Sequence, residues 1–159
     1  MKNNIYLSNL IIYFFCCLSL VLSFYLKEDG SYLPFSADFK ITWQYVLKLK
    51  ENFLSDPYPH TVHYPLHYYL LSRLDLIFND PLTVRLVICF VSMTVPYIFF
   101  VALKEKYKEK NINILFILCL SIFFIPAFRY SSVWANDRIT TDIFILAGSY
   151  FFFKYEFSR

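Results

Sequence analysis

The hydrophobic residues of this chain are gathered into long uncharged runs that short polar segments separate. The first run, 5–26, carries no charged side chain. At about 1.5 Å per residue, a helix of that length crosses the hydrocarbon core of a bilayer, about 30 Å. Similar runs follow at 82–103, 112–128 and 139–157. We therefore expect an all-α membrane protein with four transmembrane helices, the second of them kinked at Pro96.

The segment 38–54, inside the long polar insert 27–80, fits two patterns. Apolar and polar residues alternate along it, as in a strand, but the run is long for a strand. Phe39, Trp43 and Val46 also lie near helical spacing. We prefer a basic, aromatic helix lying in the membrane interface.

The segment 65–78 has the pattern of a second juxtamembrane helix. Pro65 suits a first helical position, and Asp80 and Pro81 suit the N-cap and first residue of the helix that follows. The helix is expected to end at Asn79. One apolar stripe lies opposite two charged residues; the stripe is Leu66, Tyr69, Leu70, Leu74 and Ile77, and the charges are Arg73 and Asp75.

Composition supports a membrane protein and excludes several other classes. Of the 159 residues, 58% are hydrophobic, and the two glycines cannot form a glycine-rich phosphate loop. The net charge of +3 is too small to indicate a nucleic-acid partner, and the basic residues do not cluster with aromatic residues along one face. All four cysteines fall inside apolar runs, where they act as small hydrophobic residues and form no zinc pattern.

The distribution of lysine and arginine predicts the orientation of the chain. These residues are densest in three short segments, 1–4, 104–111 and the tail from Lys154. By the positive-inside rule the N-terminus is cytoplasmic, and the 27–80 loop and the polar turn at 129–138 both face outward. The first run ends without small residues, which favours an uncleaved helix over a signal peptide.

Carboxylates and arginines near the outer face are the candidates for chemistry. Asp38 could be a general base or a helix cap, and position alone favours the cap. Asp137 has the same two interpretations, since Asn136 or Asp137 is expected to cap the fourth span. Three arginines at this level could bind phosphate or extend to lipid headgroups; they are Arg85, Arg129 and Arg138.

The three histidines, His60, His63 and His67, invite a metal interpretation. Pro65 interrupts any continuous helix through them, and no cysteine lies nearby to complete a ligand set. Hydrogen bonding at the interface, with one histidine lining a site, is the preferred interpretation. No cofactor follows with certainty from the sequence, and a divalent metal stays an open alternative.

Two outer segments resemble the outer loops of glycosyltransferase-C membrane enzymes. The first contains Ala37-Asp38-Phe39 and, after it, His63-Tyr64-Pro65-Leu66-His67-Tyr68-Tyr69-Leu70-Leu71. The second runs from Tyr130 to Thr141 and includes Asp137. This superfamily includes protein mannosyltransferases, lipid A aminoarabinose transferases and polyprenol-dependent mannosyltransferases. Phe39 replaces the second acid of their Asp-Glu pair, and His67 with a single Pro65 replaces their Pro-Pro-Leu-Tyr.

The resemblance implies an inverting transferase of a bacterial inner membrane. Its donor would be a polyprenyl-phosphate sugar, and its acceptor a glycan, lipid or protein hydroxyl outside the cytoplasm. Asp38 would deprotonate or position the acceptor, and Asp137 would shape the same pocket. Arg138 or Arg85 would offset the charge of the leaving phosphate. The remaining residues that the resemblance places against substrate are Tyr64, His67 and Tyr68.

Such enzymes have many more spans, so we expect residues 1–159 to form the single N-terminal transmembrane domain of a larger enzyme, inactive alone. The competing interpretation is a small four-helix membrane subunit or scaffold without catalysis. A transporter fragment ranks last, because only Pro96 offers a broken helix near the bilayer centre.

Overall fold

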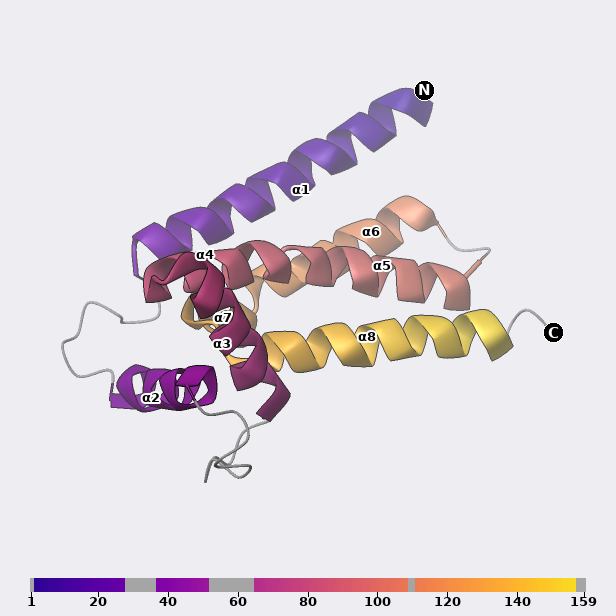
Figure 1. Ribbon diagram of the computed structural model, residues 1–159. Coiled ribbons are helices and arrows are strands. Elements are labelled where there is room, and N and C mark those ends of the chain that lie inside the picture. The colour runs from indigo at the N-terminus through magenta and orange to yellow at the C-terminus, as the bar shows by residue number, and fades with distance from the viewer. Residues whose placement is uncertain (1, 28–36, 52–64, 109–110, 157–159) are drawn as a thin grey trace.

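The computed structural model describes residues 2–27, 37–51, 65–108 and 111–156, and within these ranges every regular element is a helix (Figure 1). The elements are α1 (Lys2–Tyr25), α2 (Ala37–Glu51), α3 (Pro65–Phe78), α4 (Pro81–Ser92), α5 (Thr94–Lys106), α6 (Ile112–Leu120), the 3₁₀ helix η1 (Ser121–Phe124), α7 (Pro126–Trp134) and α8 (Asp137–Glu156). The all-α fold class is confirmed, including the helical form of the segment that begins near residue 38. The predicted helix 65–78 has the predicted bounds.

The long helices run side by side, and the short ones gather at one end. Helices α5 and α8 pack along their lengths, and α1 crosses the bundle at a tilt against α6 and α7 (Figure 1). Helices α2, α3 and α7 lie together at one end, whereas the first residues of α1 and the last of α8 lie at the other (Figure 1). The structure therefore places the described parts of the two segments that are predicted to face outward at the same end of the bundle.

Among the residues that the structure describes, two helical segments are long and apolar enough to cross a membrane, Leu7–Tyr25 and Pro81–Lys106. A third crossing follows if the bent pair Ile112–Phe124 and Pro126–Trp134 counts as one span. The predicted fourth span, 139–157, lies largely in α8, which is not among these segments. Helix length and composition support the predicted membrane character of the chain, but they do not confirm four spans.

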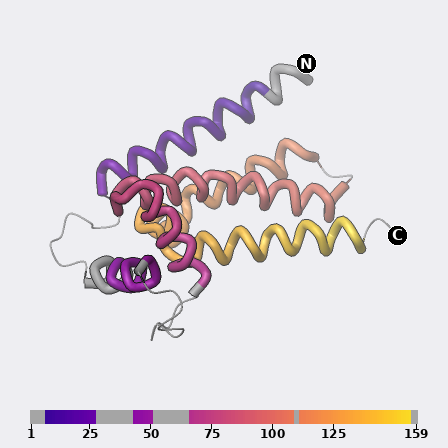
Figure 2. The backbone as a smooth tube through the Cα atoms, viewed as in Figure 1, coloured from indigo at the N-terminus to yellow at the C-terminus, as the bar shows by residue number. Residues whose placement is uncertain are grey.

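The second span breaks near Pro96 but not at it. Helices α4 and α5 follow nearly one course (Figure 2), separated by a turn at Met93. Pro96 has no N–H to donate to the Ser92 carbonyl one turn earlier, so the ladder is interrupted before the proline. Tyr13 Oη of α1 donates to the Met93 carbonyl over 2.6 Å, which ties α1 to this break.

The third span bends by 65° before Pro126. Ile125 is extended, with ψ 116°, the conformation that a residue before proline prefers. Pro126 then begins α7, as its missing N–H permits at a first helical position. The expectation of a polar turn over 129–138 is wrong: most of it is helix α7, and the turn shrinks to Ala135 and Asn136.

Candidate outer site at the α3, α7 and α8 junction

The corner between α7 and α8 carries Asp137. Ala135 closes α7 in the left-handed conformation, with φ 59° and ψ 48°. Asn136 then caps α8, because its Oδ1 accepts the Arg138 N–H over 3.0 Å. The prediction of a cap by Asn136 or Asp137 is confirmed for Asn136. Asp137 becomes the first residue of α8, where a carboxylate is favoured by the helix dipole.

His67 joins α3 to this corner. Its ring is 1% exposed, with Nε2 2.8 Å from the Ala135 carbonyl and Nδ1 2.8 Å from Thr140 Oγ1. A carbonyl oxygen only accepts, so Nε2 carries a proton, and in the neutral ring Nδ1 accepts from the Thr140 hydroxyl. These bonds connect the two segments that carry the glycosyltransferase-C resemblance. Both ring nitrogens of His67 have protein partners, so its ring positions the corner.

Tyr68 lies on the other side of the start of α3, against α2. It is 3% exposed, and its ring centroid lies 6.3 Å from that of Tyr45. Val46 and Leu49 of α2 are buried in the same core. The residue that we predicted to touch substrate therefore packs between two helices, and its role toward substrate stays a prediction.

Arg85 is buried, 6% exposed, although we expected it at the outer surface. Its Nε and Nη2 donate to the Val133 carbonyl over 3.2 and 2.9 Å, and its guanidinium lies 5.5 Å from the Phe24 ring centroid. Val133 lies in the last turn of α7, where the helix dipole favours a cation. Arg85 thus holds α1, α4 and α7 together.

Arg129 lies at the bend and reaches α1. It donates to Ser19 Oγ over 3.0 Å and to Ser23 Oγ over 2.6 Å, and also to the Phe123 carbonyl over 3.3 Å. The two serines are one turn apart on α1, so a single guanidinium fork reaches both. This arrangement explains the two serines in the second half of the first candidate span.

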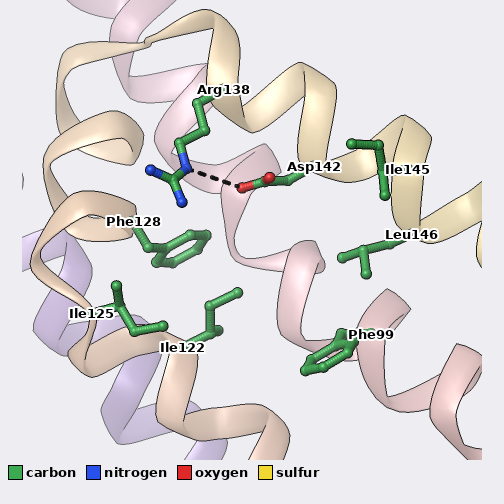
Figure 3. A pocket seen from close by; sticks show the side chains of 8 residues that line it. All are labelled: Phe99, Ile122, Ile125, Phe128, Arg138, Asp142, Ile145 and Leu146. Atoms are coloured by element: carbon green, nitrogen blue, oxygen red, sulfur yellow. Dashed lines mark ion pairs between the residues drawn. The ribbon is translucent and has the colours of Figure 1, made fainter.

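Arg138 differs from the other two arginines, because its side chain is 56% exposed. Its Nε lies 3.9 Å from Asp142 Oδ2, one turn later on α8. The pair stands at one end of a pocket of about 180 Å³ between α5, the η1–α7 bend and α8 (Figure 3). The rest of the lining is apolar and includes Phe99, Ile122 and Leu146. Arg138, one of the predicted phosphate ligands, therefore lies beside this pocket.

Several predicted site residues have side chains outside the described part of the chain. Asp38 is the second residue of α2, but its side chain is not among those described. Tyr64, His60 and His63 lie outside the described residues. Asp137 is half-buried, and its backbone carbonyl accepts the Thr141 hydroxyl over 3.1 Å.

A buried ion pair between α2 and α3 was missed by sequence reasoning. Lys50 Nζ donates to Asp75 Oδ2 over 2.8 Å and to Asn79 Oδ1 over 3.2 Å. The Asp75 side chain is only 4% exposed. The sequence did contain a signal for this pair. Asp75 is the one acid among the apolar residues at the end of α3, and such an acid commonly has a partner inside the protein.

Within the described ranges, no three histidine, cysteine, aspartate or glutamate side chains are grouped as metal ligands. Comparison of the chain with protein-family models, with curated proteins and with solved structures finds no match.

Proposed function

We propose that this chain is the N-terminal part of a membrane glycosyltransferase that moves a sugar from a polyprenyl-phosphate donor to an acceptor hydroxyl outside the cytoplasm. One observation supports it most. His67 joins the 63–71 segment to the 130–141 segment, the two segments that carry the resemblance, through bonds to the Ala135 carbonyl and Thr140 Oγ1. A shared site between the two segments requires such contact.

In this proposal each candidate residue has a distinct task. Asp38, at the start of α2, accepts the proton of the acceptor hydroxyl as that oxygen attacks the anomeric carbon. Asp137, at the start of α8, shapes the same site from the opposite segment. Arg138 rather than Arg85 offsets the leaving phosphate, because Arg85 is buried and bonded to the Val133 carbonyl. The acceptor proton ends on Asp38, and the sugar–phosphate bond breaks with its electrons on phosphate.

The test is sugar transfer by the complete enzyme in membranes, with a labelled polyprenyl-phosphate sugar. Asp38→Asn keeps the side-chain shape but cannot take a proton, so transfer should fall by about a hundredfold or more. Asp29→Asn, another acid of the same outer insert, is the matched control. Normal transfer by Asp38→Asn would refute its role as the base.

The competing function is a membrane subunit or scaffold without catalysis. It is favoured by the buried bonds of Arg85 and His67, which a purely structural role explains fully. It predicts that Asp38→Asn and Asp137→Asn variants complement a deletion of the gene as well as the native chain does. Loss of complementation by both variants at native protein levels would exclude it.

A further inference from the structure

The described helices fall into two groups, each of which packs closely within itself. The corner group is α2, α3, α4 and α7, in which α2 packs on α3, and α4 packs on both α3 and α7. Arg85 bonds α4 to α7, and Lys50 bonds α2 to α3. The long-helix group is α5, α6, η1 and α8, in which α5 packs along α8 and against α6. Each group therefore has contacts of its own that keep its helices together if one group moves against the other.

The chain is irregular wherever its described part passes between the two groups. Helix α4 gives way to α5 at Met93, η1 gives way to α7 at Ile125, and α7 gives way to α8 at Ala135. At each break a backbone amide donates to a carbonyl of the preceding helix. These break amides are those of Met93, Ile125 and Asn136, with N–O distances of 3.2, 3.1 and 2.9 Å. A hinge absorbs changes in φ and ψ at such ends of helices.

Helix α1 is continuous past the breaks and is bonded to both groups. Its second half is held by the guanidinium of Arg129, in the corner group. Its first half is held by α6 of the long-helix group, where Asn9 Nδ2 donates to Asn113 Oδ1 over 3.2 Å. Between these points Tyr13 Oη donates to the Met93 carbonyl, at the first break. Helix α1 is therefore a spine that joins the two groups along one side of the bundle.

The side of the bundle away from α1, where α8 runs, has a smaller contact between the groups (Figure 1). There the start of α3 meets the start of α8, and His67 Nδ1 lies 2.8 Å from Thr140 Oγ1. The other nitrogen of the ring donates to the carbonyl of Ala135, whose φ of 59° is strained for a residue other than glycine. His67 thus holds a strained corner, and its bond to Thr140 crosses from one group to the other.

We propose that the corner group is hinged against the long-helix group along α1, and that the His67–Thr140 bond is the latch that holds the hinge closed. Opening breaks the latch and changes the backbone at the three breaks together, because all three lie on the boundary between the groups. The strain at Ala135 favours release, since opening allows this residue to leave the left-handed region. Opening costs less free energy than unfolding, because each group keeps its own packing.

The hinge goes beyond the proposed reaction, but it bears on the site. Helix α2, which carries Asp38, belongs to the corner group, whereas Asp137 begins α8 in the long-helix group. Opening on the side of α8 therefore moves the two aspartates relative to each other. If they share a site, the open form admits substrate and the closed form completes the site.

The test is amide hydrogen exchange of the chain in detergent micelles, resolved residue by residue by NMR. Thr140→Val keeps the shape of the side chain but removes the hydroxyl of the latch, so opening should become about tenfold more frequent. Exchange of the three break amides should rise by the same factor. Thr141→Val is the matched control, because the Thr141 hydroxyl bonds a carbonyl of its own helix over 3.1 Å and does not cross the boundary.

Tyr13→Phe tests the spine independently of the latch. It removes the hydroxyl that donates to the Met93 carbonyl and leaves the ring in place. Because the breaks open together, exchange should rise by about fivefold to tenfold at the Asn136 amide as well as at the Met93 amide. Tyr25→Phe, at an exposed tyrosine of the same helix, is the control and should leave exchange unchanged.

Several outcomes would overturn the proposal. An increase confined to the Asn136 amide in Thr140→Val would indicate fraying of the α7–α8 corner, and an equal increase in the middle of α5 and α8 would indicate general unfolding. Unchanged exchange in Thr140→Val, the same increase in Thr141→Val, or an effect of Tyr13→Phe confined to the Met93 amide would each show that the breaks do not open together. None of these measurements involves sugar transfer, so coupled opening in a chain that transfers no sugar retains the hinge and rejects the reaction.

Discussion

The buried ion pair between Lys50 and Asp75 should control how firmly α2 is held. Helix α2 packs chiefly against α3, and the pair lies within that contact. Because α2 carries Asp38 at its start, its attachment matters for any chemistry at this end of the bundle. Lys50→Met removes the cation that bonds both Asp75 and Asn79. The Asp75 carboxylate, whose side chain is 4% exposed, then stays buried without its lysine.

The magnitude follows from the geometry. Two unit charges 2.8 Å apart attract by about 6 kcal/mol at an effective dielectric constant of about 20. Desolvation of both groups offsets most of this attraction, but breaking a buried pair commonly costs about 3–5 kcal/mol because one charge stays buried. The Lys50 side chain is 21% exposed, which lowers the cost to about 2 kcal/mol. Opening of α2 should then be about thirtyfold more frequent.

Hydrogen exchange of the α2 amides, followed by mass spectrometry in detergent or nanodiscs, measures this opening directly. Lys48→Met is the matched control, since Lys48 is an exposed lysine of the same helix whose Nζ lies 5.9 Å from the Tyr45 ring centroid. The double variant Lys50→Met with Asp75→Leu should restore much of the protection, because it leaves no buried charge. Exchange in α2 that is accelerated no more by Lys50→Met than by Lys48→Met would show that the ion pair does not hold the helix in place.

Two further predictions concern the bend and the start of α4. Arg129→Met removes the bonds to Ser19 and Ser23, and it should destabilise the fold by about 3 kcal/mol, measured by thermal unfolding in detergent, with Arg129→Lys recovering only part. Hydrogen bonds from Thr83 hold the pKa of Asp80 below its ordinary value. A depressed folded-state pKa means that this stabilisation is complete above the unfolded-state pKa and is lost as pH falls through the folded one, so exchange at the start of α4 should rise below about pH 4. Asp80→Asn, which also caps well, should abolish that acid dependence, and its persistence would show that another group is responsible.

Local signals in the sequence were sufficient for the ends of α3 and the start of α4. Pro65 at a first helical position, Asp80 as N-cap and Pro81 after it each act within a few residues, so the chain order alone carries the information. Asn79, with φ 49°, turns the chain between the two helices. These features need no tertiary contact to form.

Helix α7 could not be predicted in the same way. Its residues 129–132 are polar or aromatic, and this pattern predicts a turn, because polarity in a membrane protein usually marks a loop. In the structure their polar groups are used internally: Arg129 reaches α1, and the hydroxyl of Ser132 bonds the Phe128 carbonyl. The neighbouring helices α1 and α4 provide the partners for α7, and their positions are not encoded in the local pattern.

For the candidate site, the sequence could place segments but not side chains. Orientation arguments put the 27–80 loop and the Asp137 turn on one side, and the structure gathers α3, α7 and α8 there. The bonds of His67 and the burial of Arg85 depend on packing between helices that are distant in the chain. A histidine or arginine has the same sequence signal whether it binds a substrate or a neighbouring carbonyl.

The orientation of α3 shows how a membrane changes the meaning of an amphipathic pattern. Leu66, Leu70 and Ile77 of its apolar stripe are exposed, by 49%, 39% and 73%, while the opposite face buries His67 and Asp75. In water this arrangement would be costly, since each exposed leucine or isoleucine forgoes about 1.5–3 kcal/mol of burial. The predicted position of α3 at a membrane interface accounts for this arrangement, because there the apolar face would contact lipid and the polar groups would find partners inside the protein. The inward polar face thus forms the His67 contact with α7 and α8 and the Asp75 pair with α2, and both segments of the candidate site are held through it.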